Sequence, residues 1–175
     1  YLYYLITLIN MIITISGKAG SGKSTIAKIL AEKLKLRHYS IGDLMREIAK
    51  ERNISLSELS KLAEKDESID KELDKKQIAL KDRDDFVIDG RLTAFFINNA
   101  NVKVFLDCDD KVRAERILKD ERKDEKSGDI KEIIKKISER EESERVRYKK
   151  YYNADYYDKK LERKILKAYD EESFW

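Results

Sequence analysis

Residues 17–24 constrain the fold and chemistry of this chain more than any other segment, because they match the phosphate-binding loop pattern G-x-x-x-x-G-K-[ST] in full. A loop that wraps around phosphate must turn its backbone N–H groups inward, which requires positive φ and no Cβ in the way. In this pattern the Lys23 ammonium reaches the β and γ phosphates, and the Ser24 hydroxyl can ligate Mg²⁺. The residues predicted to hold a nucleoside triphosphate are Gly17, Lys18, Ala19, Gly20, Ser21, Gly22, Lys23, Ser24 and Thr25.

The segments on either side of this loop support that interpretation. Residues 11–15 are apolar and mostly β-branched, as in a buried parallel strand, and residues 26–34 carry apolar side chains at helical spacing. A helix that begins near Gly22 points its positive N-terminal end at the anion. The alternative is a glycine-rich turn that joins a strand to a helix by chance, and agreement of the pattern with both flanks disfavours it.

The rest of the chain alternates between predicted strands and helices. Strands are expected at residues 36–40, 86–89 and 102–106, and helices from about Asp43, from Ser55, from Ser68, over 109–118 and from Ile130 onward. Gly42 is expected to end the strand before Asp43, Ser55 and Glu58 to form a capping box, and Ser68 to cap its helix. This alternation predicts a three-layer α/β/α fold with a parallel sheet, and residues 1–175 are interpreted as one domain.

Composition narrows the function classes. The 38 Lys and Arg residues nearly balance the 35 Asp and Glu residues, and this leaves a net charge of +3 that does not indicate a nucleic-acid partner. A single cysteine fits a reducing cytosol. Residues 1–10 are uncharged, but with the first strand they are too short for a membrane span and lack the basic front of a signal peptide. We expect a cytoplasmic monomer without a membrane partner, in which residues 1–10 are an extension of unknown role or a further strand.

Several arginines follow the predicted strands or lie on the last helices, where they can neutralise phosphate charge. Transfer of a γ-phosphoryl group requires spread negative charge to be neutralised while donor and acceptor are held in line. Taken alone, each of these arginines fits an ordinary surface position. The set comprises Arg46, Arg91, Arg113, Arg116, Arg140, Arg145 and Arg147.

Four segments, taken in order, resemble archaeal-type cytidylate kinases. The run 40–47 looks like the S-x-G-x-hydrophobic-x-R-E segment of that family, 59–77 like its helical insert, and 89–92 like its E-G-R-L segment. The run 139–149 resembles its R-E-x-S-E-R-x-R-Y signature. The resemblance extends over about residues 11–153.

The resemblance implies a P-loop NTPase fold and transfer of the ATP γ-phosphate to CMP or dCMP with Mg²⁺. It implies a helical monophosphate-binding insert at 41–83 and a short lid at 119–129. The implied catalytic residues are Lys23, Arg91, Arg140 and Arg147; the acceptor would contact Ser40, Gly42, Arg46, Lys61, Asp70 and Arg91, and Arg113 and Arg116 would flank the donor adenine. Ser24 and Asp89 would serve Mg²⁺, with Asp89 acting through water or positioning the acceptor instead.

The chain departs from this family at several positions. Asp89 stands where the family more often has Glu, and Leu92 stands where bacterial relatives place an Asp that reads cytosine, so AMP or UMP stays open as acceptor. Residues 159–175 predict a charged helix where the family closes with an apolar strand. Another small-molecule kinase, acting for instance on a coenzyme precursor, and a non-catalytic ATP-binding module both remain alternatives. His38, the single histidine, is interpreted as structural.

Overall fold

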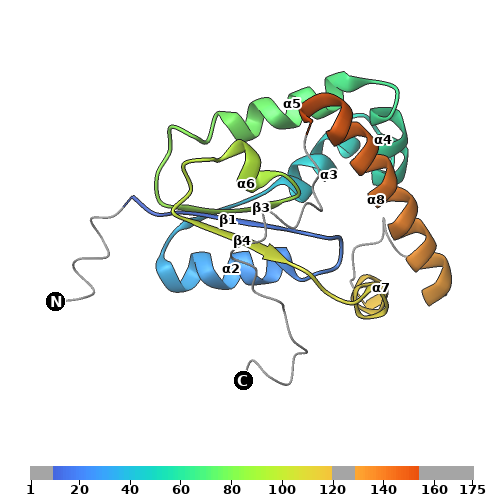
Figure 1. The fold of residues 1–175 in the computed structure, drawn as a ribbon, viewed down its shortest axis with the longest axis horizontal. Helices are drawn as coiled ribbons and strands as arrows, with labels where there is room; N and C mark the ends of the chain where they lie inside the picture. Colours follow the sequence, from blue (N-terminus) through green and yellow to red (C-terminus); the bar gives the residue numbers. More distant parts are fainter. Residues whose placement is uncertain (1–9, 120–128, 154–175) are drawn as a thin grey trace.

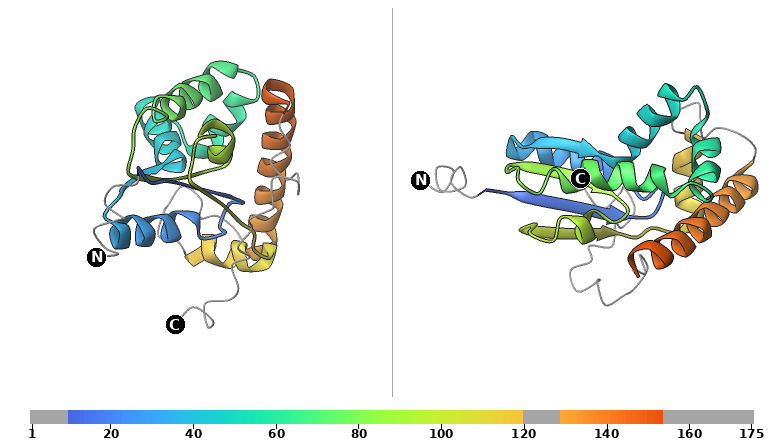
Figure 2. Two further views of the ribbon diagram at one scale, coloured as in Figure 1. Left: turned by 60° about the vertical axis from the view of Figure 1, so that its left-hand side comes forward. Right: turned by 90° about the horizontal axis from the view of Figure 1, so that it is seen from above.

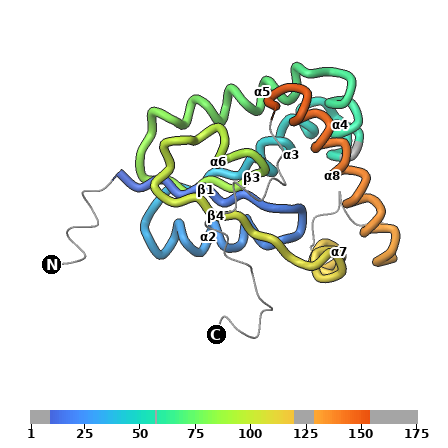
Figure 3. The backbone as a smooth tube through the Cα atoms, in the orientation of Figure 1, coloured from blue at the N-terminus to red at the C-terminus, as the bar shows by residue number. Residues whose placement is uncertain are grey.

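The computed structural model describes residues 10–119 and 129–153, and its centre is a parallel sheet (Figure 1). The strands are β1 (Ile12–Gly17), β2 (Arg37–Ser40), β3 (Phe86–Gly90) and β4 (Val102–Leu106), in the order β2-β3-β1-β4. All neighbouring pairs are parallel, so the carboxyl ends of the strands share one edge. The loop after β1 turns into the next helix at the same end where β4 leaves the sheet (Figure 3). The predicted parallel sheet is confirmed.

Helices cover both faces of this sheet. They are α2 (Lys23–Leu34), α3 (Ile41–Glu51), α4 (Leu56–Ala63), α5 (Glu67–Ile78), α6 (Thr93–Phe96), α7 (Asp110–Lys119) and α8 (Ile130–Tyr152). Helix α2 lies on one face, whereas α3, α5 and α6 lie on the other (Figure 2). The long helix α8 runs alongside these layers, with α7 near its beginning and α5 near its end (Figure 2). The sequence predicted each of these helices except the single turn α6.

Alternation along the strands divides the core into two layers. Ile13 and Ile15 of β1 are buried and pack with Ala27 and Ala31 on the α2 side of the sheet. The intervening position Ile12 belongs to the cluster on the other face, which is built with α3, α4 and α5. Because a parallel sheet in an α/β fold is covered on both sides, its central strands can be apolar at successive positions, as residues 12–15 are.

Two predicted helix boundaries are wrong. Helix α3 begins at Ile41 instead of about Asp43, because the Ser40 hydroxyl accepts a hydrogen bond from the Asp43 N–H and caps the helix before Gly42. Helix α5 is capped by Asp66, whose extended backbone lets its carboxylate accept the Ser68 N–H at 2.9 Å. Ser68 therefore lies inside the first turn. The predicted capping box of Ser55 and Glu58 is confirmed at the start of α4.

Three predictions concern residues outside the described part of the chain. These are the extension at the start, nearly all of the lid at 119–129, and the charged helix at 159–175. Within the described residues, no helix is both long enough and apolar enough to cross a membrane.

Candidate active site

A cavity of about 990 Å³ opens at the carboxyl edge of the sheet, where the connections after β1, β2 and β3 meet. This volume is at the upper end of the range for small-molecule sites. Of the predicted site residues, its lining includes Ala19, Gly20, Ser21, Gly22, Lys23, Ser24, Thr25, Gly42, Arg46, Asp70, Asp89, Arg91, Arg116, Arg140 and Arg147. The fold therefore gathers most of the predicted residues, from separate parts of the chain, around one space.

The phosphate-binding loop has a backbone that only glycine allows at two points. Gly17 has φ 151°, and a Cβ there would lie 2.3 Å from the Leu106 carbonyl oxygen. Gly20 has φ 72°, and a Cβ there would lie 2.7 Å from the Arg113 carbonyl oxygen. The loop is thus packed closely against β4 and α7, and a side chain at either position would displace the backbone.

The N-terminus of α2 is left without a side-chain acceptor. Its N-cap is Gly22 in the left-handed conformation, with no capping hydrogen bond, whereas α3, α4, α5 and α8 are all capped by the side chain of Ser or Asp. The first N–H groups of a helix need an acceptor, and the helix dipole favours a negative one. The start of α2 consequently suits a phosphate group at the cavity surface.

Lys23 lies in the first turn of α2 and is 8% exposed. Burial lowers the pKa of its ammonium well below the ordinary value, and the neighbouring Arg91 guanidinium lowers it further. Its Nζ donates to the Lys18 carbonyl oxygen at 2.6 Å. An ammonium that is desolvated and close to another cation is stabilised by an anion, so this environment favours binding of a phosphate beside Lys23.

Asp89, at the end of β3, is the centre of a buried polar cluster. Its carboxylate accepts the Ser24 hydroxyl at 2.8 Å and the Ser40 hydroxyl at 3.3 Å, both on Oδ2. The other oxygen, Oδ1, lies 2.7 Å from His38 Nε2. Asp89 is 2% exposed, and the cluster joins α2, β2 and β3.

The oxygens of Ser24 and Asp89 suit a Mg²⁺ ion that phosphate and water also hold, rather than a metal ion held by protein ligands alone. The described residues contain no group of three or more His, Cys, Asp or Glu side chains arranged to hold a metal ion. Mg²⁺ in nucleotide sites is held by one or two protein oxygens together with phosphate oxygens and water. A hydroxyl and a carboxylate beside the phosphate-binding loop match this donor set.

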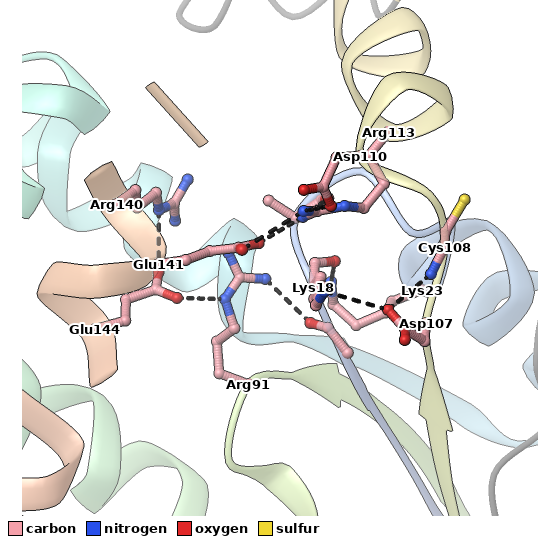
Figure 4. A network of polar contacts seen from close by, with 12 residues as sticks. Lys18, Lys23, Arg91, Asp107, Cys108, Asp110, Arg113, Arg140, Glu141 and Glu144 are labelled. Carbon is pink, nitrogen blue, oxygen red and sulfur yellow. Dashed lines mark hydrogen bonds and ion pairs between the residues drawn. The ribbon is translucent and has the colours of Figure 1, made fainter. Parts of the chain in front are cut away.

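Arg91 and Arg140 are held by one buried carboxylate, that of Glu144 in α8 (Figure 4). Arg91 Nε donates to Glu144 Oε2 at 2.7 Å, and Arg140 Nε donates to Oε1 at 3.0 Å. Burial by itself would raise the pKa of Glu144, but the guanidinium groups of Arg91 and Arg140 lower it to about 2. Arg91 also donates to the Gly17 carbonyl oxygen at 3.2 Å, which joins this arrangement to the phosphate-binding loop.

Arg147 and Arg46 enter the cavity from the helical side. Arg147 is 5% exposed, and its Nη1 donates to the Asp70 carboxylate of α5 at 2.8 Å. Burial raises the pKa of Asp70, and the Arg147 guanidinium opposes that rise. Arg46, on α3, pairs with Asp43 one turn earlier. Arg46, Arg91, Arg140 and Arg147 are called the arginine clamp below.

Helix α5 contributes one wall of the cavity, called the α5 wall below. Asp70, Asp74 and Gln77 follow one another at helical spacing, and all three line the cavity. Asp74 is half-buried and accepts a hydrogen bond from the Tyr152 hydroxyl of α8. Burial raises the pKa of Asp74 to about 6, although the hydrogen bond from Tyr152 opposes this. Phe96 and Tyr148, which belong to an aromatic and aliphatic cluster with Leu92, line the cavity next to this wall.

Arg113 does not lie where the resemblance implied. It is 1% exposed beneath the loop, donates to the Ala19 carbonyl oxygen at 3.1 Å, and pairs with Glu141 and Asp110 (Figure 4). Arg113 is absent from the cavity lining among the described residues. Its neighbour one turn on, Arg116, does line the cavity.

Four other predicted residues also lie outside the cavity lining of the described chain. Lys61 is exposed on α4, and Ser40 is buried as the cap of α3 and a partner of Asp89. Gly17 and Lys18 precede the part of the loop that faces the cavity, although Lys18 offers its carbonyl oxygen to Lys23.

Sequence reasoning assigned no role to Glu144 and left His38 outside the site. The signal for Glu144 was its place four residues after Arg140, a spacing that brings two side chains together on a helix. The signal for His38 was its place two residues before Ser40, which puts both on one face of β2. Neither spacing by itself shows which residue of another helix or strand is the partner.

Comparison with known proteins agrees with this geometry. A family model described as the cytidylate kinase-like family matches residues 12–163. Cytidylate kinase from Pyrococcus horikoshii is 40% identical over 149 residues, covering 85% of this chain and 75% of that protein. Cytidylate kinase from Methanocaldococcus jannaschii is 43% identical over 149 residues, covering 83% of this chain and 81% of that protein.

Two solved structures share the fold at low identity. Shikimate kinase from Acinetobacter baumannii, in complex with shikimate, has a TM-score of 0.60 and 14% identity, covering 96% of this chain and 88% of that chain. Shikimate kinase from Bacteroides thetaiotaomicron has a TM-score of 0.58 and 19% identity, covering 79% and 81% of the two chains. They confirm the predicted α/β kinase fold and, at these identities, no more than the fold.

Proposed function

This chain belongs to the cytidylate kinase-like family, and we propose that it transfers the γ-phosphoryl group of ATP to CMP or dCMP. One observation carries the proposal: a phosphate-binding loop and a clamp of four arginines line the same cavity. A protein that only binds a triphosphate needs the loop, whereas an acceptor phosphate needs cations of its own. The clamp supports a second phosphate-bearing substrate beside the first.

The donor binds along the phosphate-binding loop in this proposal. The uncapped N-terminus of α2 and the Lys23 ammonium hold the β and γ phosphates, and Arg116, which also lines the cavity, flanks the adenine. Ser24 would provide an oxygen ligand for Mg²⁺, and Asp89 would hold the Ser24 hydroxyl and reach the ion through water. The ion would neutralise phosphate charge. Residues 17–25 thus bind and orient the phosphate that is transferred.

The acceptor monophosphate binds between α3, α5 and α8. Arg46 and Arg91 grip its phosphate, and Arg140 and Arg147 complete the positive surroundings in which charge develops during transfer. The buried carboxylates of Glu144 and Asp70 hold three of these arginines in place before substrate arrives. Because the cations are already oriented, little reorganisation is needed at the moment of reaction.

The α5 wall supports a base that carries an amino group. Asp70, Asp74 and Gln77 line this part of the cavity, and carboxylate and amide oxygens accept hydrogen bonds from an exocyclic amine such as that of cytosine. Uracil presents a carbonyl oxygen at that position, which the acceptor oxygens of Asp70 and Asp74 would repel. The α5 wall therefore favours CMP over UMP, and AMP also carries an exocyclic amine. The proposal further includes a cytoplasmic, monomeric enzyme with small-molecule partners.

The direct test is to incubate the protein with ATP, Mg²⁺ and each of CMP, dCMP, UMP and AMP, and to follow ADP formation. We expect the highest kcat/KM with CMP or dCMP. Parallel arms with shikimate and with a coenzyme precursor test another small-molecule kinase. ATP binding without ADP formation above the acceptor-free control in any arm would instead indicate a non-catalytic ATP-binding module.

A further inference from the structure

We infer that His38 is a positioning residue for Asp89, and that its hydrogen bond determines how tightly the protein binds the magnesium form of the donor nucleotide. This inference rests on the proposed function only for the identity of the donor. His38 has no role in the resemblance that the sequence shows, and its role follows from the contacts around Asp89.

The register of the sheet places His38 and Ser40 beside Asp89. In the parallel pairing of β2 with β3, His38 lies opposite Val87 and Ser40 opposite Asp89. Positions two apart on a strand point to the same face, and Val87 packs on the α2 side of the sheet. His38, Ser40 and Asp89 therefore face α2, where Ser24 lies in the first turn.

The two oxygens of Asp89 have different partners. Oδ2 accepts the hydroxyls of Ser24 and Ser40, at 2.8 Å and 3.3 Å. Within the described part of the chain, His38 is the one side chain hydrogen-bonded to Oδ1, at 2.7 Å. An ionised carboxylate only accepts hydrogen bonds, so the hydrogen lies on Nε2 and His38 donates. Loss of this donor would leave Oδ1 buried without a partner, because Asp89 is 2% exposed.

His38 acts on the nucleotide only through Asp89. Ser24 and Asp89 line the cavity, whereas His38 does not belong to its lining. Its side chain is 17% exposed. By giving its proton to Asp89 Oδ2, the Ser24 hydroxyl turns its lone pairs toward the cavity. The hydrogen bonds of His38 and Ser24 to Asp89 thus orient the Ser24 oxygen as a ligand for a cation. Such outer partners of metal ligands are typically worth 10–100-fold in metal affinity or activity.

The alternative is that His38 merely ties β2 to β3. If His38 only held the two strands together, its loss would destabilise the fold and would weaken ATP binding equally with and without metal. A positioning residue affects the metal-bound nucleotide selectively. The two roles therefore differ in the ratio between the dissociation constant of ATP in EDTA and that of ATP in MgCl₂.

The test measures both dissociation constants by calorimetry on wild type, His38→Ala and His38→Gln. Glutamine is the conservative variant, because its amide nitrogen can reach the position of Nε2 and donate to Asp89. We expect His38→Ala to weaken binding of Mg·ATP about 10-fold and of metal-free ATP less than about twofold. His38→Gln should restore Mg·ATP binding to within about threefold of wild type. Arg37→Ala is the matched control, since Arg37 is exposed one position earlier on the same strand.

A double variant links the effect to Ser24. If His38 acts through Asp89 and Ser24, the losses of Mg·ATP affinity in His38→Ala and Ser24→Ala are not additive in the double variant. If His38→Ala fails to fold, His38→Asn replaces it, since that amide is one methylene shorter than Gln and falls short of Asp89. Equal weakening of Mg·ATP and metal-free ATP, or full additivity, overturns the inference. A wild-type protein that binds Mg·ATP but phosphorylates no monophosphate overturns the proposed function alone, and the His38 comparison can still be made by binding.

Discussion

The phosphate-binding loop and the arginine clamp lie on two sides of one cavity, and different contacts hold them in place. The loop depends on the backbone of consecutive residues: glycines at positive φ, and a helix whose first N–H groups have no side-chain acceptor. The clamp depends on ion pairs between residues far apart in the chain, such as Arg91 with Glu144 and Asp70 with Arg147. A phosphate site built from backbone is encoded locally, whereas one built from side chains requires buried anions to hold its cations.

The sharpest test of the loop is Lys23→Ala, for which we expect the largest loss of activity. Removing a cation that stabilises transition-state charge should lower kcat/KM by about 10³-fold or more. Because Lys23 is desolvated in the free protein, the variant should unfold no earlier than wild type without nucleotide, but it should lose the stabilisation that ATP confers. Steady-state kinetics and thermal melts with and without ATP measure both effects. Lys28→Ala, on the exposed side of α2, should leave both unchanged.

The clamp can be broken without removing an arginine, by Glu144→Gln. The pKa of Glu144 is lowered from 4.5 to about 2, which corresponds to about 3 kcal/mol of stability at pH 7. A lowered folded-state pKa stabilises above the ordinary value, and this stability is lost as the pH falls toward 2. The difference between wild type and Glu144→Gln in denaturant unfolding should therefore shrink between pH 5 and pH 2.

Turnover of Glu144→Gln should also fall, since Arg91 and Arg140 lose their shared anion. Glu142→Gln is the control, because Glu142 is exposed two residues earlier on α8. A stability difference that stays constant down to pH 2 would show that the pairing contributes little.

Arg46→Ala separates the acceptor side from the donor side. The loss of charged hydrogen bonds to the acceptor phosphate should raise the KM for CMP about 10–100-fold. The dissociation constant of ATP should change less than about twofold, because Arg46 lies on α3 and not on the loop. Lys50→Ala, on an exposed position of the same helix, should change neither constant. Equal loss of acceptor and ATP binding would contradict the assigned roles.

The smallest effect is expected at Asp74, on the α5 wall. Its pKa is raised from 3.8 to about 6 by burial, so its contribution to stability is full below about pH 4 and is lost as the pH rises through 6. A shift of about two pKa units corresponds to about 3 kcal/mol, and solvent screens part of it because Asp74 is only half-buried. Asp74→Asn should therefore be more stable than wild type by about 1–2 kcal/mol at pH 8 and equal to it at pH 4. Denaturant unfolding at the two pH values measures this, with the exposed Asp82→Asn as control. A gain that is the same at both pH values would rule out ionisation as its cause.

Predictions from the sequence succeeded where the signal was local. Apolar runs located β1, β3 and β4, and the capping box located α4 within the chain. They were wrong where two local signals competed: Gly42 was interpreted as a strand breaker, but the Ser40 hydroxyl starts α3 before it. Likewise, Asp66 and Ser68 are both good caps, and the extended backbone at Asp66 decides between them. The single turn α6 has no periodicity to detect.

The site residues, too, could be predicted from the sequence only where the signal was local. Arg113 and Arg116 lie three residues apart on one helix, and the sequence offered no way to tell that one is buried under the loop and the other lines the cavity. Burial of Arg113 is possible because Glu141, 28 residues later, supplies a carboxylate. A partner that distant cannot be inferred from spacing.

By itself, the sequence determined a phosphate-binding loop between a strand and a helix, an α/β fold, and a set of arginines suited to a second phosphate. These features depend on backbone conformation and periodicity, which act over a few neighbouring residues. Only the tertiary structure decided which arginines face the cavity, that Glu144 holds two of them, and that His38 is bound to Asp89. Ion pairs and hydrogen bonds between separate elements depend on distances of a few ångströms, and packing sets those distances.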